Sequence, residues 1–442
     1  MSRKLVKPAT TLVMMLSVTA VYADLVSGMR AYHAKDYTTA FDEFLVGAKS
    51  GDAASQYFLA GLYADGHGVE RNDAQAVVWL YRAARAGDAS AQYRLGSFYS
   101  DGRGVEQDYG EARHWFRMAA KKSDTGAQFS LGYMAANGIG GEQDLSAARR
   151  WYEQAADSGH GAAQHNLAFM YYRGEGVERD LTQAVWLFER AAATGNPDAQ
   201  YSLGTLYRLG KGVEQDIPHA VKLLERAARQ GHASAQYNLG QMARKGNGVK
   251  PDIVQAVRLF RAAADQGHVR AAYNLAFLLA HAPKPLGSPD TAIRYYQRAA
   301  SAGYAPALVN LGTMYGNGLG VDPDPIEAYA LWTLAANAGE ARAQKNLEKL
   351  AAAMTLGERA TGNARMAALA ANYKKLPRQE THPNKAPETP ATAVSKTATT
   401  QPFARSTLPA QSASALQMQA RRAPAKTPPA FEYYDGDGYF AD

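Results

Sequence analysis

The chain has 442 residues and contains no cysteine, which excludes a disulfide framework, thiolate chemistry and a lipid-modified cysteine. Its formal net charge is +7, but Arg3, Lys4 and Lys7 supply three of these charges and a net +3 lies from Lys374 onward. The part between is therefore near neutral. The charge gives no support for nucleic-acid binding, and we expect none.

Residues 1–23 have the features of a cleavable signal peptide. A positive segment precedes an apolar run at Leu12–Val18, and Val21-Tyr22-Ala23 supplies a small-residue cleavage site. The alternative is a retained anchor, but the apolar run is too short to span a bilayer. We therefore expect a mature chain that begins at Asp24, is periplasmic or secreted, and does not insert into a membrane.

Residues 53–340 repeat one 36-residue pattern eight times without an insertion. Steps of 36 residues from Leu203 reach a leucine in every unit, and steps of 36 from Ala220 reach an alanine in every unit. A fixed period of this length predicts an all-α solenoid of stacked supersecondary units. Residues 24–52 resemble an incomplete, tetratricopeptide-like hairpin and are expected to cap the array. The eight units begin at Ala53, Ala89, Thr125, Gly161, Pro197, Ala233, Val269 and Ala305.

Each unit is predicted to be a helical hairpin, most clearly at Pro197–His232. Apolar residues three and four apart mark one face of a first helix, and Gly210 ends it. Asp216 can cap the second helix, which Gly231 ends. Four units have capping-box spacing at that place: Asp108 with Glu111, Asp180 with Gln183, Asp252 with Gln255, and Asp324 with Glu327.

The seventh unit departs most from the pattern. It has His281-Ala-Pro-Lys-Pro285 in place of the glycine loop, and Ala272 where most other units have glutamine. Prolines cannot copy a glycine turn, so we expect a local change of curvature there. The alternative is a loop that has drifted without acquiring a role.

The end of the chain has three parts. Residues 341–373 are predicted to be C-terminal capping helices. Residues 374–430 are basic and rich in Pro, Thr and Ala, a composition typical of disorder. Residues 431–442 are aromatic and acidic, and they can dock on a partner, fold back onto the basic residues of units four to six, or have no function. Asp435-Gly-Asp437 lacks the remaining ligands of a calcium loop, so no metal is expected.

The repeat resembles the Sel-one-like (SLR) class of tetratricopeptide-related solenoids. The resemblance rests on Ala199, Leu203-Gly204, Tyr207, Gly210, Gly212-Val213, Asp216, Ala220, Ala227-Ala228 and Gly231. It implies a right-handed α/α superhelix. It also implies an adaptor for protein complexes, a role that members of this class often have in bacterial envelopes, in secretion or in host contact.

No arrangement for catalysis is evident. The chain lacks a G-x-S-x-G elbow, an H-E-x-x-H motif and a P-loop, and its glycine loops recur at hairpin turns. His160 and His165 are five residues apart and do not share a helix face. We expect a non-enzymatic protein without catalytic residues, metal or cofactor. The alternative that the resemblance leaves open is an envelope enzyme or modulator acting on peptidoglycan or β-lactams.

Binding is the favoured function, and the first helices are expected to line the concave face. Positions there that the repeat leaves variable carry amides and aromatic rings, which suit an extended peptide. The alternative is that the aromatic rings pack between neighbouring first helices. The predicted partner-binding residues are Tyr133, Asn166, Phe169, Asn238, Gln241, Asn274, Phe277 and Asn310.

Charge also changes along the array. Asp65 and Asp101 end early first helices, whereas basic residues stand at or near the matching places in later units. This basic band consists of Arg173, Arg208, Lys211, Arg244 and Lys245. It can steer an acidic partner, or it is a solvated loop edge. The sequence thus favours an exported scaffold for a protein or peptide, with a secreted host-interacting factor as another alternative.

Overall fold

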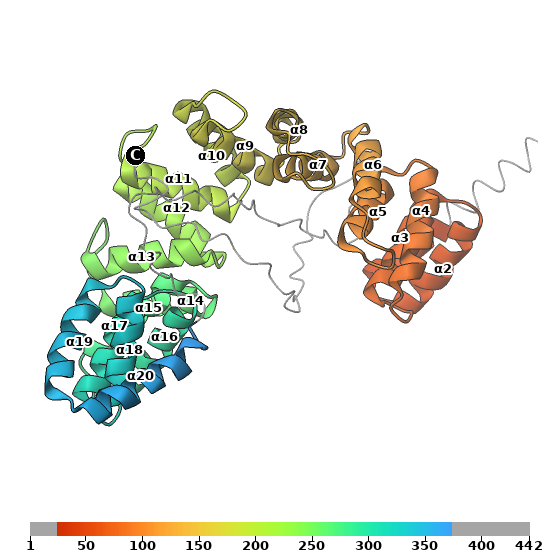
Figure 1. Ribbon diagram of the computed structural model, residues 1–442. Coiled ribbons are helices and arrows are strands. Elements are labelled where there is room, and N and C mark those ends of the chain that lie inside the picture. Colours follow the sequence, from red (N-terminus) through yellow and green to blue (C-terminus); the bar gives the residue numbers. More distant parts are fainter. Residues whose placement is uncertain (1–23, 374–442) are drawn as a thin grey trace, which may run out of the picture. The chain divides into compact units, whose positions relative to one another are not determined.

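The computed structural model describes residues 24–373, and all regular secondary structure in that range is helical (Figure 1). The predicted signal peptide (1–23), basic tail (374–430) and aromatic-acidic end (431–442) lie outside the described residues. The helices form two compact units that divide after Asp180. We call them the N-terminal unit (24–180) and the C-terminal unit (181–373).

The N-terminal unit begins with a helix over residues 24–33. Helices α3 and α4, α5 and α6, and α7 and α8 pair as hairpins, and consecutive hairpins stack through α4 and α5, then α6 and α7, then α8 and α9. The helices are α2 (Tyr37–Lys49), α3 (Ala53–Asp65), α4 (Asp73–Arg85), α5 (Ala89–Asp101), α6 (Tyr109–Ala120), α7 (Thr125–Asn137), α8 (Leu145–Asp157) and α9 (Gly161–Arg173).

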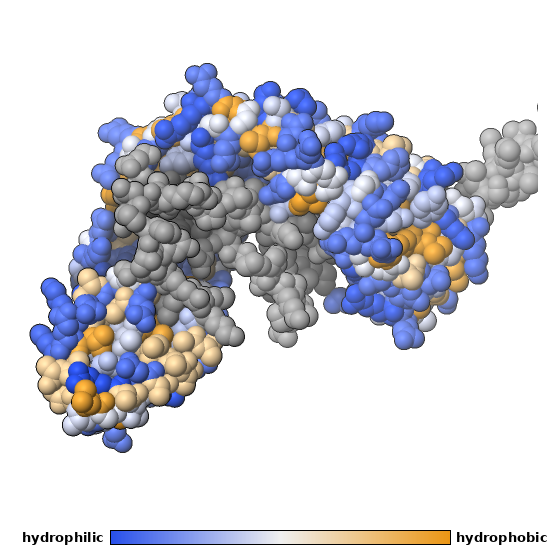
Figure 2. Space-filling model, viewed as in Figure 1, coloured by the Kyte–Doolittle hydropathy of each residue, from blue (hydrophilic) through white to orange (hydrophobic). Residues whose placement is uncertain are grey.

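The C-terminal unit continues the pattern and ends with α18 packed against both α19 and α20. Figure 2 shows pale orange, moderately hydrophobic residues over α18–α20, where α20 exposes Ala364, Ala367 and Ala368. Its helices are α10 (Leu181–Ala193), α11 (Pro197–Leu209), α12 (Ile217–Arg229), α13 (Ala233–Lys245), α14 (Ile253–Asp265), α15 (Val269–His281), α16 (Pro289–Ser301), α17 (Pro306–Asn317), α18 (Pro325–Asn337), α19 (Ala341–Ala353) and α20 (Leu356–Ala370).

The repeated apolar columns form the core, which confirms the predicted fold class. The leucine of every first helix is buried, from Leu59 to Leu311, and Leu203 is only 3% exposed. The paired alanines, such as Ala83 and Ala84, are buried where neighbouring helices approach closely. Because no single hairpin encloses these residues, burial of apolar area depends on stacking.

The predicted helix ends are also observed, with one correction. Gly210 has a left-handed φ of 66°, and the Asp216 side chain accepts from the His219 N–H at 2.8 Å. The reciprocal half of the predicted capping boxes is not made at Glu111 or Glu327. Glu111 instead accepts from the Trp115 indole at 3.1 Å, and Glu327 binds Arg365. Glu111 thus bonds within its own helix, whereas Glu327 has a charged partner on α20.

The second glycine of each loop has a role that the sequence did not reveal. Gly104 has φ of 66°, and a Cβ there would lie 2.3 Å from the Asp73 carbonyl oxygen at the start of α4. Equivalent contacts join Gly212 to Leu181 and Gly248 to Ile217. The glycine therefore allows each loop to touch the second helix of the unit before it.

A glutamine column ties each first helix to the preceding hairpin. Gln92 donates to the Ala84 carbonyl at 3.0 Å, and Gln56, Gln164, Gln200 and Gln236 repeat this bond to the residue eight positions earlier. In the seventh unit Ala272 has no amide. There Arg298 donates to the Ala264 carbonyl at 2.7 Å, which is the oxygen that the missing glutamine would have bound.

The seventh hairpin closes despite its different loop. The Ser288 backbone N–H donates to the Leu279 carbonyl at 2.8 Å, as the Asp216 backbone N–H donates to the Tyr207 carbonyl at 3.0 Å in the fifth unit. Helices α15 and α16 remain paired. The change of curvature expected at this loop stays a prediction.

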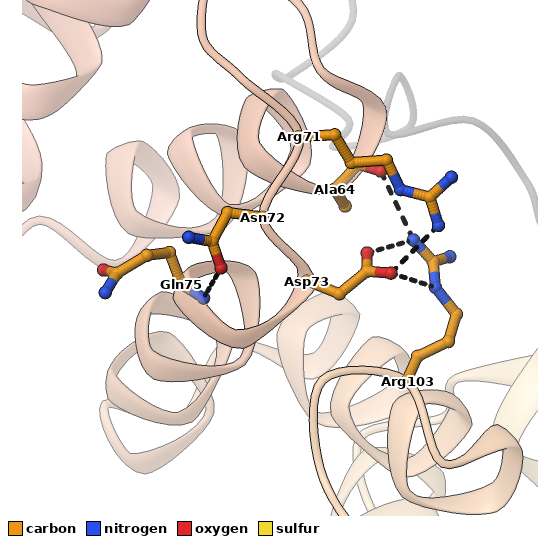
Figure 3. A network of polar contacts seen from close by, with 6 residues as sticks. All are labelled: Ala64, Arg71, Asn72, Asp73, Gln75 and Arg103. Atoms are coloured by element: carbon orange, nitrogen blue, oxygen red, sulfur yellow. Dashed lines mark hydrogen bonds and ion pairs between the residues drawn. The ribbon is translucent and has the colours of Figure 1, made fainter.

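An ion-pair network joins adjacent hairpins of the N-terminal unit (Figure 3). Arg103, in the loop after α5, binds the Asp73 carboxylate and donates to the Ala64 carbonyl at 3.3 Å. Arg71 binds the same carboxylate at 2.9 Å. Burial works in the opposite direction, but the bonds from Arg103 and Arg71 hold the pKa of Asp73 below its usual range.

Candidate partner-binding site

A polar cavity of about 290 Å³ lies on the first helices of the C-terminal unit. Five predicted residues meet there, three from the partner-binding set and two from the basic band: Asn238, Gln241, Asn274, Arg208 and Lys245. We call it the α13 pocket, because that helix supplies five of the eleven lining residues, more than any other element. The complete lining is Arg208, Tyr237, Asn238, Gln241, Met242, Lys245, Asn247, Arg270, Tyr273, Asn274 and Tyr304.

Helical periodicity explains why these residues share one surface. Asn238, Gln241 and Lys245 are three and four positions apart on α13, so they lie on one helix face. Leu239 is buried in a core cluster with Val221 and Leu224 of the preceding hairpin. The pocket is therefore a consequence of the same repeat that forms the core.

The column asparagines are largely engaged within the protein. Asn274 donates to the Tyr237 hydroxyl at 3.4 Å, and Asn310 donates to the hydroxyls of Tyr273 and Tyr296, both at 3.1 Å. In the N-terminal unit, Asn166 donates to the Tyr152 hydroxyl at 3.2 Å. These amides connect helices, so they serve the stacking of the repeat whatever they do for a partner.

Two buried donors in the α13 pocket have no acceptor. Asn238 is only 7% exposed, and its Nδ2 has no hydrogen-bond partner. The amide also lies beside the Tyr201 hydroxyl, where it opposes the rise that burial causes in the pKa of that tyrosine. Arg208 Nε is likewise buried without a partner. An unmet buried donor is unfavourable, so this arrangement favours a ligand that brings an acceptor.

The remaining polar groups of the pocket are partly satisfied. Gln241 donates to the Tyr237 hydroxyl at 3.0 Å and accepts from Arg244 Nε at 3.1 Å. Arg244 itself does not line the cavity, and its contact with Gln241 orients that side chain. The sequence placed both residues near a partner, and the structure gives them different roles.

The pocket is electropositive. Arg208, Lys245 and Arg270 line it, and no acidic residue does. Burial raises the pKa of the Tyr237 hydroxyl, while Gln241, Arg270 and Asn274 act against that rise. Burial also raises the pKa of Tyr304, again opposed by Arg270. The cations thus act on the pocket wall and favour an anionic ligand.

Histidines that cap first helices stack on the tyrosines of this surface. His268 Nδ1 accepts from the Ala271 N–H at 3.1 Å, and its ring stacks on Tyr237 at 4.6 Å between centroids. His232 does the same with Ala235 and Tyr201. Sequence analysis missed these caps, although steps of 36 from His268 reach Asp52, Asp88 and Asp124, all N-cap residues.

The other predicted residues lie outside the α13 pocket. Phe277 is 40% exposed and stacks on His281 at 4.5 Å, and Lys211 lies in the loop after α11. In the N-terminal unit, the Arg173 guanidinium carbon lies 5.3 Å from the centre of the Phe169 ring. Tyr133 is half-buried, and its ring centre is 6.5 Å from that of Phe129.

Residues 24–373 contain no cluster of three or more histidines, aspartates or glutamates placed to hold a metal ion. His160 caps α9 and His165 is buried within it, so neither is part of such a cluster. In the same range no helix combines the length and the apolar character that crossing a membrane requires.

The Sel1 repeat family model matches the chain eight times, at residues 53–88, 89–124, 125–160, 161–196, 197–232, 233–268, 269–304 and 305–340. The chain belongs to the Sel1 repeat family. The matched segments have the same boundaries as the eight units counted along the sequence. No curated protein matches the chain closely enough to count as a relative.

Two solved structures are similar in fold. One is c5321 of uropathogenic Escherichia coli, a protective antigen with an SLR fold. It is 25% identical with a TM-score of 0.55, and the match covers 86% of this chain and all of that one. The other is a Sel1 repeat protein from Oxalobacter formigenes. It is 29% identical with a TM-score of 0.51, and the match covers 54% of this chain and 96% of that one.

Proposed function

We propose that this protein is a non-enzymatic, exported scaffold that binds an acidic protein or peptide partner through the α13 pocket. Sel1 and tetratricopeptide-like repeat proteins generally mediate protein–protein interactions, and Sel1 repeat scaffolds are generally non-enzymatic. The observation that carries the proposal is the pair of buried donors, Arg208 Nε and Asn238 Nδ2, which have no acceptor in a cationic cavity.

Recognition follows from the chemistry of the wall. A carboxylate of the partner accepts from Arg208 and Asn238, and charge-assisted bonds of this kind are stronger than those between neutral groups. Lys245 and Arg270 attract the same charge from a distance and raise the rate of encounter. The tyrosine rings offer flat apolar surface to a neighbouring side chain of the partner.

Export is supported by the signal-peptide features of residues 1–23. Cell fractionation tests it: the protein is expected in the periplasm or the medium, and recovery from the cytoplasm alone would contradict it. A second candidate, a secreted factor that meets host proteins, is favoured by the similarity to a protective antigen of uropathogenic Escherichia coli. Protein confined to the periplasm would exclude that candidate.

Site-specific photocrosslinking tests the pocket in the native envelope. A photoreactive amino acid replaces Gln241 in the pocket or, as a matched control, the exposed Lys222 on α12. We expect a crosslinked partner only from position 241, and loss of that crosslink when Arg208→Gln and Lys245→Gln are added. Equal crosslinking from both positions, or no effect of the double substitution, would contradict the proposal.

A further inference from the structure

We infer that the α13 pocket binds the chain's own C-terminal segment, residues 431–442, and that this segment competes there with external partners. The inference shares its pocket with the proposed function. It does not require an external partner to exist, because its ligand is part of the same polypeptide.

The pocket requires an anion. Three cations, Arg208, Lys245 and Arg270, line it without an acidic residue. The buried donors Arg208 Nε and Asn238 Nδ2 have no acceptor among the described residues. A carboxylate has two oxygens and about four lone-pair sites, so one carboxylate can accept from both donors at once.

The pocket also suits an aromatic side chain. Tyr237, Tyr273 and Tyr304 contribute rings to its wall, and Tyr273 meets Tyr304 edge-on at 5.1 Å. Met242 adds a polarisable thioether, which packs well against rings. A cavity of about 290 Å³ is small for a ligand site, so it fits a short peptide element.

Residues 431–442 combine these two chemistries. The segment has four acidic residues (Glu432, Asp435, Asp437 and Asp442), five aromatic residues (Phe431, Tyr433, Tyr434, Tyr439 and Phe440), and no basic residue. The preceding stretch, residues 374–430, has nine basic residues and only two acids, Glu380 and Glu388. A cationic pocket therefore attracts the last twelve residues and repels the stretch before them.

The stretch between α20 and residue 431 is long enough for residues 431–442 to contact the α13 pocket. The helix α20 belongs to the same compact unit as the pocket. The 57 residues from 374 to 430 span up to about 190 Å when extended, far more than the width of such a unit. A segment joined to its own binding site acts at a high effective concentration, so a modest intrinsic affinity suffices for occupancy.

A competition experiment tests the inference. A fluorescently labelled peptide with the sequence of residues 431–442 is titrated by anisotropy into the full chain and into a chain that ends at Ala430. We expect the shortened chain to bind the peptide at least tenfold more tightly than the full chain, because its pocket is empty. Equal affinity of the two chains would overturn occupancy by the chain's own segment.

Matched substitutions locate the site. In the shortened chain, Arg208→Gln with Lys245→Gln is expected to weaken peptide binding at least tenfold. Arg226→Gln with Arg229→Gln removes the same charge from exposed positions on α12 and is expected to have no effect. Equal losses from both pairs would show a non-specific charge effect and overturn the assignment. A second probe is the peptide in which the four acidic residues are replaced by glutamine or asparagine. If this peptide bound as tightly as the original, the assignment would also be overturned.

The two proposals fail in distinguishable ways. If position 241 captures a partner but the peptide does not bind, the scaffold function stands and the competition is wrong. If the peptide binds and no partner is captured, the pocket serves the chain's own end and the proposed function is wrong.

Discussion

The two units fold from one repeat but use its free positions differently. In the N-terminal unit, aspartates cap α3, α5 and α7, and Asp65 and Asp101 end α3 and α5. In the C-terminal unit, Asn196, His232 and His268 cap α11, α13 and α15, and basic residues stand near the ends of α11 and α13. The core columns are the same in both.

This difference shows which positions stacking constrains. A core leucine touches its own hairpin and the next, so a change there affects two units. Helix ends and the outer face of first helices lie at the edge of the array, where several residue types satisfy the backbone. Those edges are where the C-terminal unit acquired a cationic pocket and the N-terminal unit acquired the Asp73 network.

The largest expected effect is the loss of stability when a core leucine is truncated, and it should be confined to the unit that carries the substitution. Leu203→Ala should destabilise the C-terminal unit by about 2–5 kcal/mol, because it leaves a cavity between stacked hairpins. Leu95→Ala is the matched change in the N-terminal unit, since both leucines are buried. Hydrogen exchange should show the loss of protection mainly in the unit that carries the substitution. Equal loss in both units would mean that they unfold together.

Acid should affect His268, which caps α15 in the C-terminal unit. Burial, with Arg270 and His232 nearby, lowers the pKa of His268 to about 4. The unfolded chain therefore binds more protons than the folded one between pH 6.5 and 4, and stability falls as the pH falls through this window. The loss from His268 is roughly 3 kcal/mol by pH 4.

The substitution His268→Asp tests whether histidine caps are more sensitive to acid than aspartate caps. Burial raises the pKa of the capping Asp88 and Asp124, so their contribution is not lost as the pH falls through that window. His268→Asp should remove the acid sensitivity at α15, measured by hydrogen exchange at pH 7 and pH 4.5. His160 also has a lowered pKa, so α9 should lose protection with the C-terminal caps. Unchanged acid sensitivity in His268→Asp would contradict the assignment.

The stability cost of replacing a loop glycine by alanine should differ between the units, because the new Cβ meets different atoms. In Gly104→Ala the new Cβ meets the backbone oxygen of Asp73, whereas in Gly248→Ala it meets a side-chain methyl group of Ile217. We expect Gly104→Ala to cost about 2–3 kcal/mol, as strain and overpacking combine. Gly248→Ala should cost less. Gly159→Ala is a control for the positive φ alone, because nothing lies near its Cβ. Thermal unfolding that ranked Gly159→Ala first would contradict this order.

The smallest effect concerns the glutamine column. Arg298→Ala should cost about 1 kcal/mol, because the Ala264 carbonyl loses its side-chain donor and keeps the Gly267 N–H. Adding Ala272→Gln should restore most of that loss by supplying the amide that other units have. Gln92→Ala in the N-terminal unit is the matched deletion, to be compared by urea unfolding. Failure of Ala272→Gln to rescue Arg298→Ala would show that the two donors are not equivalent.

The sequence by itself determined the period, the hairpins, the buried leucine and alanine columns, and the glycine and aspartate helix ends. These follow from local rules: helical periodicity, the left-handed preference of glycine, and capping over three residues. It also indicated that Asn238, Gln241 and Asn274 share a face, since Asn238 and Gln241 are three residues apart on one helix and Asn274 follows Asn238 by one 36-residue repeat.

Only the tertiary structure decided which polar groups are satisfied. Asn310 meets Tyr273, 37 residues away, and Arg298 replaces a glutamine at Ala272 by reaching back 34 residues to Ala264. Such bonds depend on how neighbouring hairpins stack, which residue spacing within one unit does not specify. The same stacking leaves Asn238 and Arg208 without acceptors, and so it distinguishes a candidate binding site from a structural column.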